Sequence, residues 1–291
     1  MIAEAAARAI GRPLAAARRV AGGDINDAWR VELADGTRAF VKSRAGAIAG
    51  EYATEAAGLR WLAEPDDGLA VPAVLAVSDA PPPFLALEWI DEGRLDAAGE
   101  EALGRGLARV HAAGASGFGE PPPGAPLGGL RLGAVELPAA TAEDWPAFYA
   151  EHRLAPLLRA ASDRGALPPR GAARIEAVIA RLAELAGPPE PPARLHGDLW
   201  GGNVLASADG RPHLIDPAAH GGHGLTDLAM LHLFGAPELA AITAEYVAAA
   251  QLEPDWQNLI GLHQLHLLLV HAVSHGPSYG AAAERTAARY A

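Results

Sequence analysis

The sequence contains no cysteine, and only one of its 23 basic residues, Lys42, is a lysine. The lack of cysteine excludes disulfide bonds, a thiol nucleophile and cysteine-bound zinc. No stretch is apolar over the length of a membrane span, and the apolar stretch 259–273 carries three histidines. The first residues do not show the basic segment and apolar run of a signal peptide. We therefore expect a cytoplasmic protein without a membrane partner.

Positive charge is also scarce, because 35 acidic residues outnumber 23 basic ones and leave a net charge of −12. A chain of this sign does not favour nucleic-acid binding, so we expect no nucleic-acid partner. Apolar side chains, in contrast, are abundant and make up half of the 291 residues. This is enough to build one large domain or two lobes with a substantial core.

Three polar side chains, Asp198, Asn203 and Asp216, lie in the stretch 195–217 between apolar segments typical of short strands. A kinase catalytic loop has an aspartate five residues before an asparagine, and a second, metal-binding aspartate beyond a hairpin. Mg²⁺ prefers oxygen ligands and takes few from the protein when ATP phosphates supply the rest. We therefore predict that Asp198 is the general base, and that Asn203 and Asp216 bind magnesium. The alternative is a tight turn, since these residue types are common in turns.

Lys42 lies in the second of two alternating segments, 28–33 and 37–43, which are joined by Asp35 and Gly36. An Asp-Gly pair between such segments predicts a β-hairpin. A compact ammonium on the second strand can reach a phosphate in a way that a planar guanidinium cannot. The sequence therefore predicts that Lys42 binds a phosphate of ATP, with chance retention of one lysine as the alternative.

Two further features indicate where the rest of ATP would bind. Before the hairpin, Gly22 and Gly23 would let backbone amides approach the phosphates. Gly-Gly-Asp is also an ordinary turn, however, and it lacks the full spaced-glycine pattern. At the end of a strand expected over 84–90, the main-chain groups of Glu88 and Ile90 can bind adenine.

A helix predicted over 51–63 carries two glutamates that could pair with Lys42 and fix its ammonium over the phosphates. Glu55 is the first candidate, because it lies a little over one turn before the apolar Leu59. Glu51 is the competitor. Either residue could instead be a solvated glutamate on the helix surface.

The remainder of the chain is predicted to be mainly helical. Asp96 and Asp144 can cap two helices, and Thr226 can cap a third that begins at Asp227. We interpret Asp227 as a buried brace of the catalytic loop. The segment 114–142, rich in glycine and proline, is predicted to be a long surface excursion that could cover the substrate site. Other helices are expected over 1–14, 175–185, 237–250, 254–275 and 278–290, and another strand over 71–77.

Trp200 lies two residues after the proposed base, so its indole can stack on the apolar face of a sugar or on a cationic amine. The alternative is that Trp200 packs beneath the loop. His196 precedes the Gly-Asp pair and is expected to brace the loop through hydrogen bonds. The other histidines lack a recurring acidic or cysteine partner, so we interpret them as core or pocket residues.

These residues resemble the motifs of the fructosamine kinases, or ketosamine kinases, which are related to aminoglycoside and choline kinases. The most specific segment is 196–204, His-Gly-Asp-Leu-Trp-Gly-Gly-Asn-Val. Its tryptophan, Trp200, distinguishes the family from the broader antibiotic-kinase pattern. The resemblance covers nearly the whole chain, and other similar segments are 145–154, 215–218, 222–223, 227–230, 269–271 and 278–280.

The resemblance implies an α+β, protein-kinase-like fold with two lobes. Residues 1–90 would form a small ATP-binding lobe of antiparallel sheet plus a helix, and residues 91–291 a large, mainly helical lobe. It implies MgATP as the cofactor and a ketosamine, free or protein-bound, as the substrate. Phosphorylation of the sugar C3 hydroxyl would give a 3-phosphate that decomposes and releases the amine, so the reaction would be a deglycation.

The resemblance implies that Lys42 binds phosphate, that Glu55 orients Lys42 and that Asp198 is the base. It also implies that Asn203 and Asp216 bind magnesium and that Trp200 contacts the sugar. Four features depart from the family pattern. Asp24 stands where many relatives have cysteine, Leu225 where an acidic residue is usual, and His220 where tyrosine is common. The segment 127–137 also lacks the usual polar pattern. A kinase of the aminoglycoside or choline kinase type, with another hydroxyl acceptor, is therefore the alternative function, and a nucleotide-binding protein without activity is a third.

Overall fold

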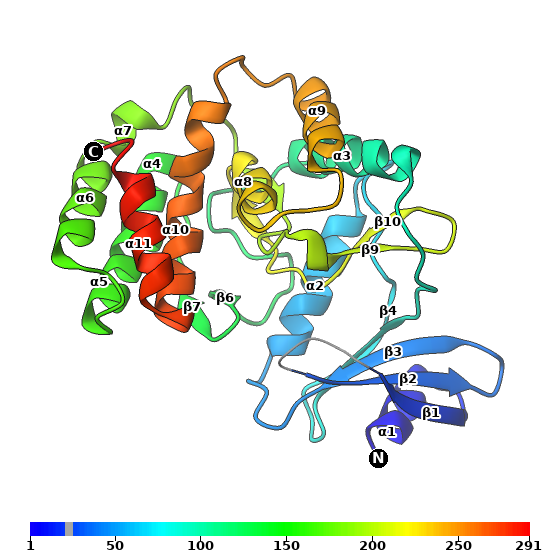
Figure 1. Ribbon diagram of the computed structural model, residues 1–291. Helices are drawn as coiled ribbons and strands as arrows, with labels where there is room; N and C mark the ends of the chain where they lie inside the picture. Colours follow the sequence, from blue (N-terminus) through cyan, green and yellow to red (C-terminus); the bar gives the residue numbers. More distant parts are fainter. Residues whose placement is uncertain (21–25) are drawn as a thin grey trace.

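The computed structural model describes residues 1–20 and 26–291, so the predicted phosphate-binding glycines Gly22 and Gly23 lie outside the described residues. The N-terminal part is built on a five-stranded antiparallel sheet with the strand order β1-β2-β3-β5-β4 (Figure 1). The strands are β1 (Leu14–Val20), β2 (Asp27–Leu33), β3 (Arg38–Ser43), β4 (Val74–Ser78) and β5 (Phe84–Glu88).

Two helices, α1 (Ile2–Ile10) and α2 (Glu51–Ala63), cover opposite faces of this sheet. Successive side chains of a strand point to opposite faces, and β5 follows this rule. Phe84 packs with the alanines of α1, whereas the next residue, Leu85, packs with α2. Because both faces are covered, β5 is buried along its length until Glu88.

The hairpin predicted around Asp35 and Gly36 is confirmed. Strands β2 and β3 pair with Asp27 opposite Ser43, and Gly36 has the positive φ (+83°) that its turn requires. Strand β1 was not predicted. Its five interior residues are exposed at the edge of the sheet, so they lack the apolar alternation that identifies a half-buried strand.

The rest of the chain is mainly helical, as predicted. Its helices are α3 (Ala97–Ala112), α4 (Trp145–Tyr149), α5 (Ala155–Asp163), α6 (Pro169–Ala180), α7 (Leu182–Leu185), α8 (Leu225–Phe234), α9 (Leu239–Ala250), α10 (Gln257–His275) and α11 (Pro277–Ala287). A π-helical turn, η1 (Ala150–Leu154), joins α4 to α5. One core forms around α10 and α11 and another around α3 and α8. In the described chain, every helix is too short or too polar to cross a membrane.

Two of the three predicted helix caps are confirmed. Asp96 caps α3 and Asp144 caps α4, each by accepting a hydrogen bond from the backbone N–H three residues later. The prediction for Thr226 is wrong, because α8 begins at Leu225, two residues before the predicted start at Asp227, and has no side-chain cap. The Thr226 hydroxyl instead lies 3.0 Å from Nδ1 of the buried His263.

The segment 114–142 is more than a surface excursion. It contains the antiparallel strands β6 (Leu130–Leu132) and β7 (Val135–Leu137). Phe118 and the apolar residues of both strands are buried in the core around α10 and α11. The prediction of a surface excursion was wrong for these residues because each apolar alternation, Leu130–Leu132 and Val135–Leu137, covers only three residues and is too short to identify a strand.

Helix α2 connects the sheet to the helical part of the molecule. Tyr52 and Leu59 pack on the sheet, whereas Trp61 and Leu62 pack in the core around α3 and α8. In Figure 1 the sheet and α1 lie at one end, the other helices lie at the opposite end, and α2 lies between them. This is the expected α+β, two-lobe arrangement, while the boundary after residue 90 stays a prediction.

Candidate active site

The predicted catalytic stretch folds around two pairs of short antiparallel strands. β8 (Ala193–Leu195) pairs with β11 (His220–Gly222), and β9 (Val204–Ala206) pairs with β10 (Pro212–Leu214). The loop that carries Asp198 leaves β8, and the β9–β10 hairpin follows it. The pairing of β8 with β11 therefore brings this loop next to the segment that connects β10 to β11.

Two residues in these loops have a left-handed backbone. Gly197 has φ +81°, and a Cβ at this position would lie 2.2 Å from the carbonyl oxygen of Ala218, so the loop requires glycine here. Asp216 has φ +54°, a conformation that is uncommon for residues other than glycine but is tolerated by aspartate. Such backbone conformations cluster at functional sites, where the surrounding structure maintains them.

The loop before Asp198 is braced by buried hydrogen bonds. The Asp227 carboxylate accepts hydrogen bonds from the backbone N–H groups of His196 (2.7 Å) and Gly197 (2.9 Å). Nε2 of His111 lies 3.1 Å from the same carboxylate. Burial opposes the ionisation of Asp227, but these hydrogen bonds and the nearby histidines hold its pKa below the ordinary value. Asp227 therefore has the contacts expected of a brace.

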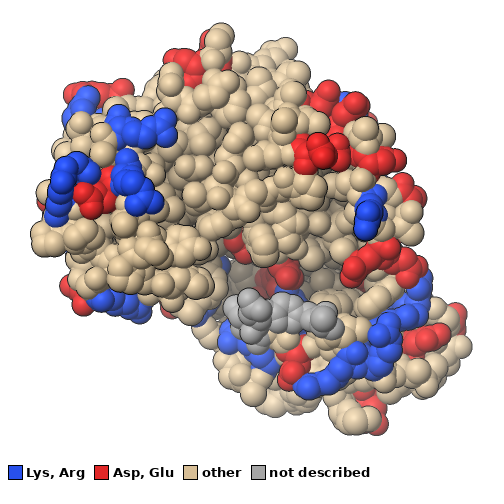
Figure 2. Space-filling model, in the orientation of Figure 1, with Lys and Arg blue, Asp and Glu red and all other residues tan. Residues whose placement is uncertain are grey.

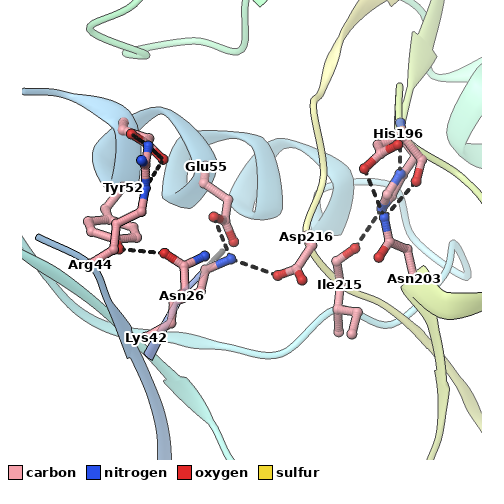
Figure 3. A network of polar contacts seen from close by, with 11 residues as sticks. Asn26, Lys42, Arg44, Tyr52, Glu55, His196, Asn203, Ile215 and Asp216 are labelled. Carbon is pink, nitrogen blue, oxygen red and sulfur yellow. Dashed lines mark hydrogen bonds and ion pairs between the residues drawn. The ribbon is translucent and has the colours of Figure 1, made fainter. Parts of the chain in front are cut away.

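His196 connects this loop to the segment before Asp216. Its ring nitrogen Nε2 lies 2.9 Å from the carbonyl oxygen of Ile215, and Nδ1 accepts a hydrogen bond from the Asp198 N–H at 3.3 Å (Figure 3). Both ring nitrogens are thus used to fix backbone groups. These contacts agree with the predicted bracing role of His196.

Lys42 lies at the contact between the sheet and the catalytic stretch. In β3 it is paired with Leu85, so its side chain points to the face covered by α2. There Nζ lies 2.7 Å from Oε2 of Glu55 and 2.7 Å from Oδ1 of Asp216 (Figure 3). Burial alone would lower the pKa of Lys42, but the two carboxylates outweigh this effect and raise it. Lys42 is therefore a buried, charged ammonium that bridges the two parts of the site.

The structure distinguishes the two glutamates that the sequence left as alternatives. Glu51 forms an ion pair with Arg44, in which Nη2 lies 2.6 Å from Oε1. Glu55 instead directs Oε2 to Lys42, and its Oε1 is buried without a hydrogen-bond partner among the described residues. Burial raises the pKa of Glu55 above its ordinary value, although the adjacent ammonium acts in the opposite direction. Glu55 is therefore the partner of Lys42.

Asp198 and Asn203 lie at the two ends of a tight turn. The second half of this turn is the short 3-10 helix η2 (Gly201–Asn203). Asn203 Nδ2 donates hydrogen bonds to the Asp198 backbone carbonyl (2.7 Å) and to its carboxylate oxygen Oδ2 (3.2 Å). Within the described chain, the amide oxygen of Asn203 accepts no hydrogen bond. Burial raises the pKa of Asp198 above the ordinary value of an aspartate.

The predicted site residues in the described chain line one cavity of about 1170 Å³. Figure 2 shows the hollow between the sheet and the helical part of the molecule. The predicted residues among those that line it are Lys42, Glu55, Glu88, Ile90, Asp198, Trp200, Asn203 and Asp216. Side chains from distant parts of the sequence are thus brought to a common wall, as the proposed chemistry requires.

The end of β5 forms the part of the cavity wall where adenine binding was predicted. The Glu88 N–H donates to the Ala73 carbonyl at 2.8 Å, and the Trp89 N–H donates to the Arg38 carbonyl at 3.2 Å. The Ile90 N–H, in contrast, has no hydrogen-bond partner among residues 1–20 and 26–291. A backbone donor at a cavity wall is the type of group that can bind a base nitrogen.

The donor set fits a divalent cation and a triphosphate. Asp216 and Asn203 offer carboxylate and amide oxygens, which are the hard ligands that Mg²⁺ prefers. The carboxylates of Glu55, Asp198 and Asp216 line the cavity, and Lys42 is paired with two of them, so negative charge exceeds positive charge among these four side chains. The charge of Asp216 acts to raise the pKa of both other carboxyl groups, which reflects this excess of negative charge. A bound divalent cation would offset the excess.

Trp200 lines the cavity instead of packing beneath the loop. The residue is 43% exposed, and its indole lies over Gly202, where a Cβ would come within 2.3 Å of the ring. Glycine at position 202 thus leaves room for the ring against the loop. This exposure favours the predicted ligand-stacking role, which stays a prediction.

Arg153 was not predicted as a site residue, yet it lines the cavity beside His220. No signal in the sequence singled it out, because Arg153 directly follows Glu151 and His152 in a helical stretch and resembles an ordinary surface residue there. Of the departures from the family pattern, Leu225 is buried in the core around α3 and α8 and does not line the cavity. His220 does line it, and burial lowers the pKa of this histidine to about 4, so its ring is neutral at pH 7.

Several of the other histidines pack in the core. The His263 ring stacks on Trp145 at 4.5 Å, and His223 lies 4.9 Å from the same indole. Among the described residues, no group of three or more histidine or acidic side chains could hold a metal ion by itself. A magnesium ion at Asn203 and Asp216 would therefore need phosphate oxygens to complete its coordination.

Comparison with known proteins identifies close relatives. The family model described as fructosamine kinase matches residues 1–290. A probable ketoamine kinase from Synechocystis is 33% identical over 90% of this chain and 85% of that protein. One from Thermus thermophilus is 34% identical over 89% of this chain and 87% of that protein. The crystal structure of a protein provisionally named as a fructosamine-3-kinase, from Thermobifida fusca, is 42% identical, with a TM-score of 0.90 over 99% of this chain and 98% of that chain.

More distant structures show the same fold. A macrolide 2'-phosphotransferase from Brachybacterium faecium has a TM-score of 0.62 at 18% identity, over 96% of this chain and 95% of that chain. Identity this low supports only a shared architecture. The fold is therefore protein-kinase-like, as the sequence predicted.

Proposed function

Because the chain belongs to the fructosamine kinase family and is an ATP-dependent phosphotransferase, we propose that it phosphorylates the C3 hydroxyl of a ketosamine. The observation that carries the proposal is the convergence of Lys42, Glu55, Asp198, Asn203 and Asp216 on one cavity. The names of the curated relatives support a ketoamine as the acceptor class. Release of the amine from an unstable 3-phosphate would make the overall reaction a deglycation.

Asp198 is the proposed proton acceptor. The acceptor oxygen forms a bond to the γ-phosphorus, the bond from this phosphorus to the bridging oxygen of ADP breaks, and the hydroxyl proton moves to the Asp198 carboxylate. Its raised pKa makes Asp198 a better proton acceptor than an exposed aspartate would be. The hydrogen bond from Asn203 keeps the carboxylate oriented.

The groups around Lys42 are proposed to hold the nucleotide. Lys42 would contact the α- and β-phosphates, and its ion pair with Glu55 would keep the ammonium in position. Asp216 and Asn203 would hold magnesium, which when bound neutralises charge on the phosphates. The main chain at Glu88 and Ile90 would bind adenine.

Trp200 is proposed to bind the sugar of the acceptor. Its exposed indole lines the same cavity as Asp198, two residues away in the sequence. Stacking of an apolar sugar face on an indole would hold the ring without using polar groups needed for catalysis. The hydroxyl to be phosphorylated could then be directed to Asp198.

The proposal is tested by incubating the purified protein with MgATP and fructoselysine or ribuloselysine. Phosphorus NMR should detect a sugar 3-phosphate and ADP in equal amounts, followed by loss of the sugar from the amine. The Asp198→Asn variant serves as the control for contaminating kinases. Absence of turnover with every ketosamine tested would overturn the proposal.

A kinase that acts on another hydroxyl acceptor is the alternative. Two departures from the family pattern favour it, because His220 and the segment 127–137 both contribute to the cavity wall. A substrate screen decides between the two functions. A higher kcat/KM for an aminoglycoside or an amino alcohol than for any ketosamine would select the alternative.

A further inference from the structure

Arg153 is a buried cation without an acidic partner in the described chain. It lies on the π-helical turn η1, and only 3% of the residue is exposed. Its guanidinium carbon lies 4.4 Å from the centre of the Phe148 ring, and Nη1 donates a hydrogen bond to the carbonyl oxygen of His152 at 2.9 Å. Neither contact neutralises the charge. π-Helical turns are rare and often occur at functional sites.

Arg194 shows that the same fold does supply a carboxylate to another buried arginine. Arg194 is 8% exposed and lies over the Trp61 ring at 4.7 Å. It donates to the Trp61 carbonyl oxygen at 2.5 Å and lies 3.0 Å from Oε2 of Glu64. Arg194 lies outside the cavity wall, whereas Arg153 is part of it. A buried charge without a counter-ion is costly. The difference between the two arginines therefore suggests that a bound ligand neutralises the charge of Arg153.

Two nitrogen atoms of Arg153 are available to such a ligand. Nε and Nη2 have no hydrogen-bond partner among the described residues. Both atoms keep some contact with solvent. The fully buried side-chain atoms without a partner in the described chain are Glu55 Oε1 and His263 Nε2. Because Arg153 lines the cavity, its small exposed surface opens to the space that also contacts Asp198 and Trp200.

The histidines next to Arg153 neither neutralise its positive charge nor add positive charge of their own. Burial lowers the pKa of His220 to about 4 and that of His266 to about 3, and the charge of Arg153 acts in the same direction. Both rings are therefore neutral at pH 7. Burial also lowers the pKa of Arg153 itself, to about 10, which still leaves the guanidinium charged at pH 7.

We propose that Arg153 binds an anionic group of the acceptor, either a carboxylate or a phosphate. A guanidinium presents parallel N–H donors that match the paired oxygens of these groups. A ketosamine formed on the α-amine of a free amino acid carries a carboxylate close to the sugar, whereas one formed on a lysine within a protein does not. A sugar phosphate supplies the other anion. The inference rests on the proposed function, because it takes the acceptor to be a sugar amine.

The wild-type protein can be tested with matched acceptors. Fructosyl-glycine and fructosyl-glycinamide differ by one carboxylate, and each can be compared with its sugar 6-phosphate. We expect kcat/KM to be about 10- to 100-fold higher for the acid than for the amide, mainly through a lower KM. A preference for the 6-phosphate alone would identify phosphate as the anion. Equal values for all four acceptors would overturn the proposal.

Two substitutions separate the charge of Arg153 from its shape. Arg153→Gln removes the charge and should bring the acid-to-amide ratio close to one, whereas Arg153→Lys should give an intermediate ratio. Arg194→Lys is the matched control, and it should lower the melting temperature without changing the ratio. If Arg153→Gln raised the KM for ATP and left the ratio unchanged, Arg153 would belong to nucleotide binding and the proposal would be wrong.

Calorimetry without ATP distinguishes failure of this inference from failure of the proposed function. Tighter binding of fructosyl-glycine than of its amide, with no phosphoryl transfer to either, would support the role of Arg153 and contradict the ketosamine kinase activity. Equal affinities for the acid, the amide and their two 6-phosphates, or binding of none of the four compounds, would overturn the inference about Arg153. The wild-type comparison needs no substitution, so it decides the question even if Arg153→Gln does not fold.

Discussion

Two buried cations line the cavity, and they differ in what neutralises them. Lys42 lies 2.7 Å from each of two carboxylates, Glu55 and Asp216, whereas Arg153 contacts no carboxylate in the part of the chain that the structure describes. The charged groups proposed to bind the nucleotide therefore already contact one another before a ligand binds. The side proposed for the acceptor keeps a positive charge for the ligand to neutralise.

This difference is consistent with the demands of the two substrates. ATP is the same in every turnover, so fixed charges that position its phosphates reduce the reorganisation needed during the reaction. An acceptor must also be distinguished from similar hydroxyl compounds, and a buried charge without a partner penalises any acceptor that fails to match it. Substitutions at the site test whether the two sides are separable.

Asp216→Ala should have the largest effect, because it removes a proposed magnesium ligand and one of the two anions beside Lys42. We expect phosphoryl transfer to fall below detection and magnesium-dependent ATP binding to disappear. Calorimetry of ATP binding with and without magnesium measures this loss. Asp209→Ala, in the exposed turn between β9 and β10, is the control and should bind as the wild type does. Magnesium-dependent binding by Asp216→Ala would contradict the assignment.

Asp198→Asn should reduce kcat by about 10²- to 10⁴-fold and leave ATP binding nearly unchanged, because it removes the base but keeps the shape of the side chain. The wild-type rate should also depend on pH. Since burial raises the pKa of Asp198, the protonated, inactive form persists to a higher pH than for an ordinary aspartate. The rate should therefore be lost as the pH falls through this raised pKa. A near-normal rate for Asp198→Asn would show that another group accepts the proton.

The Lys42→Arg variant should use ATP poorly although the substitution preserves the positive charge. One nitrogen of Lys42 lies 2.7 Å from both carboxylates, and a planar guanidinium with separated donors does not fit that arrangement. We expect kcat/KM for ATP to fall about 10²-fold. The reverse exchange, Arg44→Lys, is made next to the same strand and should have a much smaller effect, since Arg44 pairs with Glu51 at a more exposed position. Unimpaired use of ATP by Lys42→Arg would remove the specific role of the lysine.

Much of the site was predictable because its information is local in the sequence. The five-residue spacing of Asp198 and Asn203 is set by one turn, and the hairpin that follows returns the chain toward Asp216. The pairing of Lys42 with Glu55 was predictable as a choice between two glutamates on one helix. The decision required the structure, because Arg44 binds Glu51 and leaves Glu55 for the lysine.

The remaining features depend on contacts between distant segments. The contact of Lys42 with Asp216 joins the sheet to the catalytic stretch, and no local pattern encodes it. Strand β1 is identified by its pairing with β2, since its own side chains are exposed. Arg153 looks like an ordinary helix residue until the fold places it at the cavity wall. Tertiary packing, which a single sequence does not display, decides each case.

The smallest predicted effect concerns the two glutamates of α2. Glu55→Gln keeps a hydrogen-bond acceptor near Lys42 but removes the charge, so we expect the apparent KM for ATP to rise about tenfold, or about 1.4 kcal/mol. Glu51→Gln is the matched substitution one helical turn away. It should change the KM by less than about twofold, because its partner Arg44 is partly exposed and such ion pairs contribute little. Steady-state kinetics with ATP as the varied substrate measures both. Equal effects of the two substitutions would mean that α2 acts on ATP through its overall charge and not through the contact between Glu55 and Lys42.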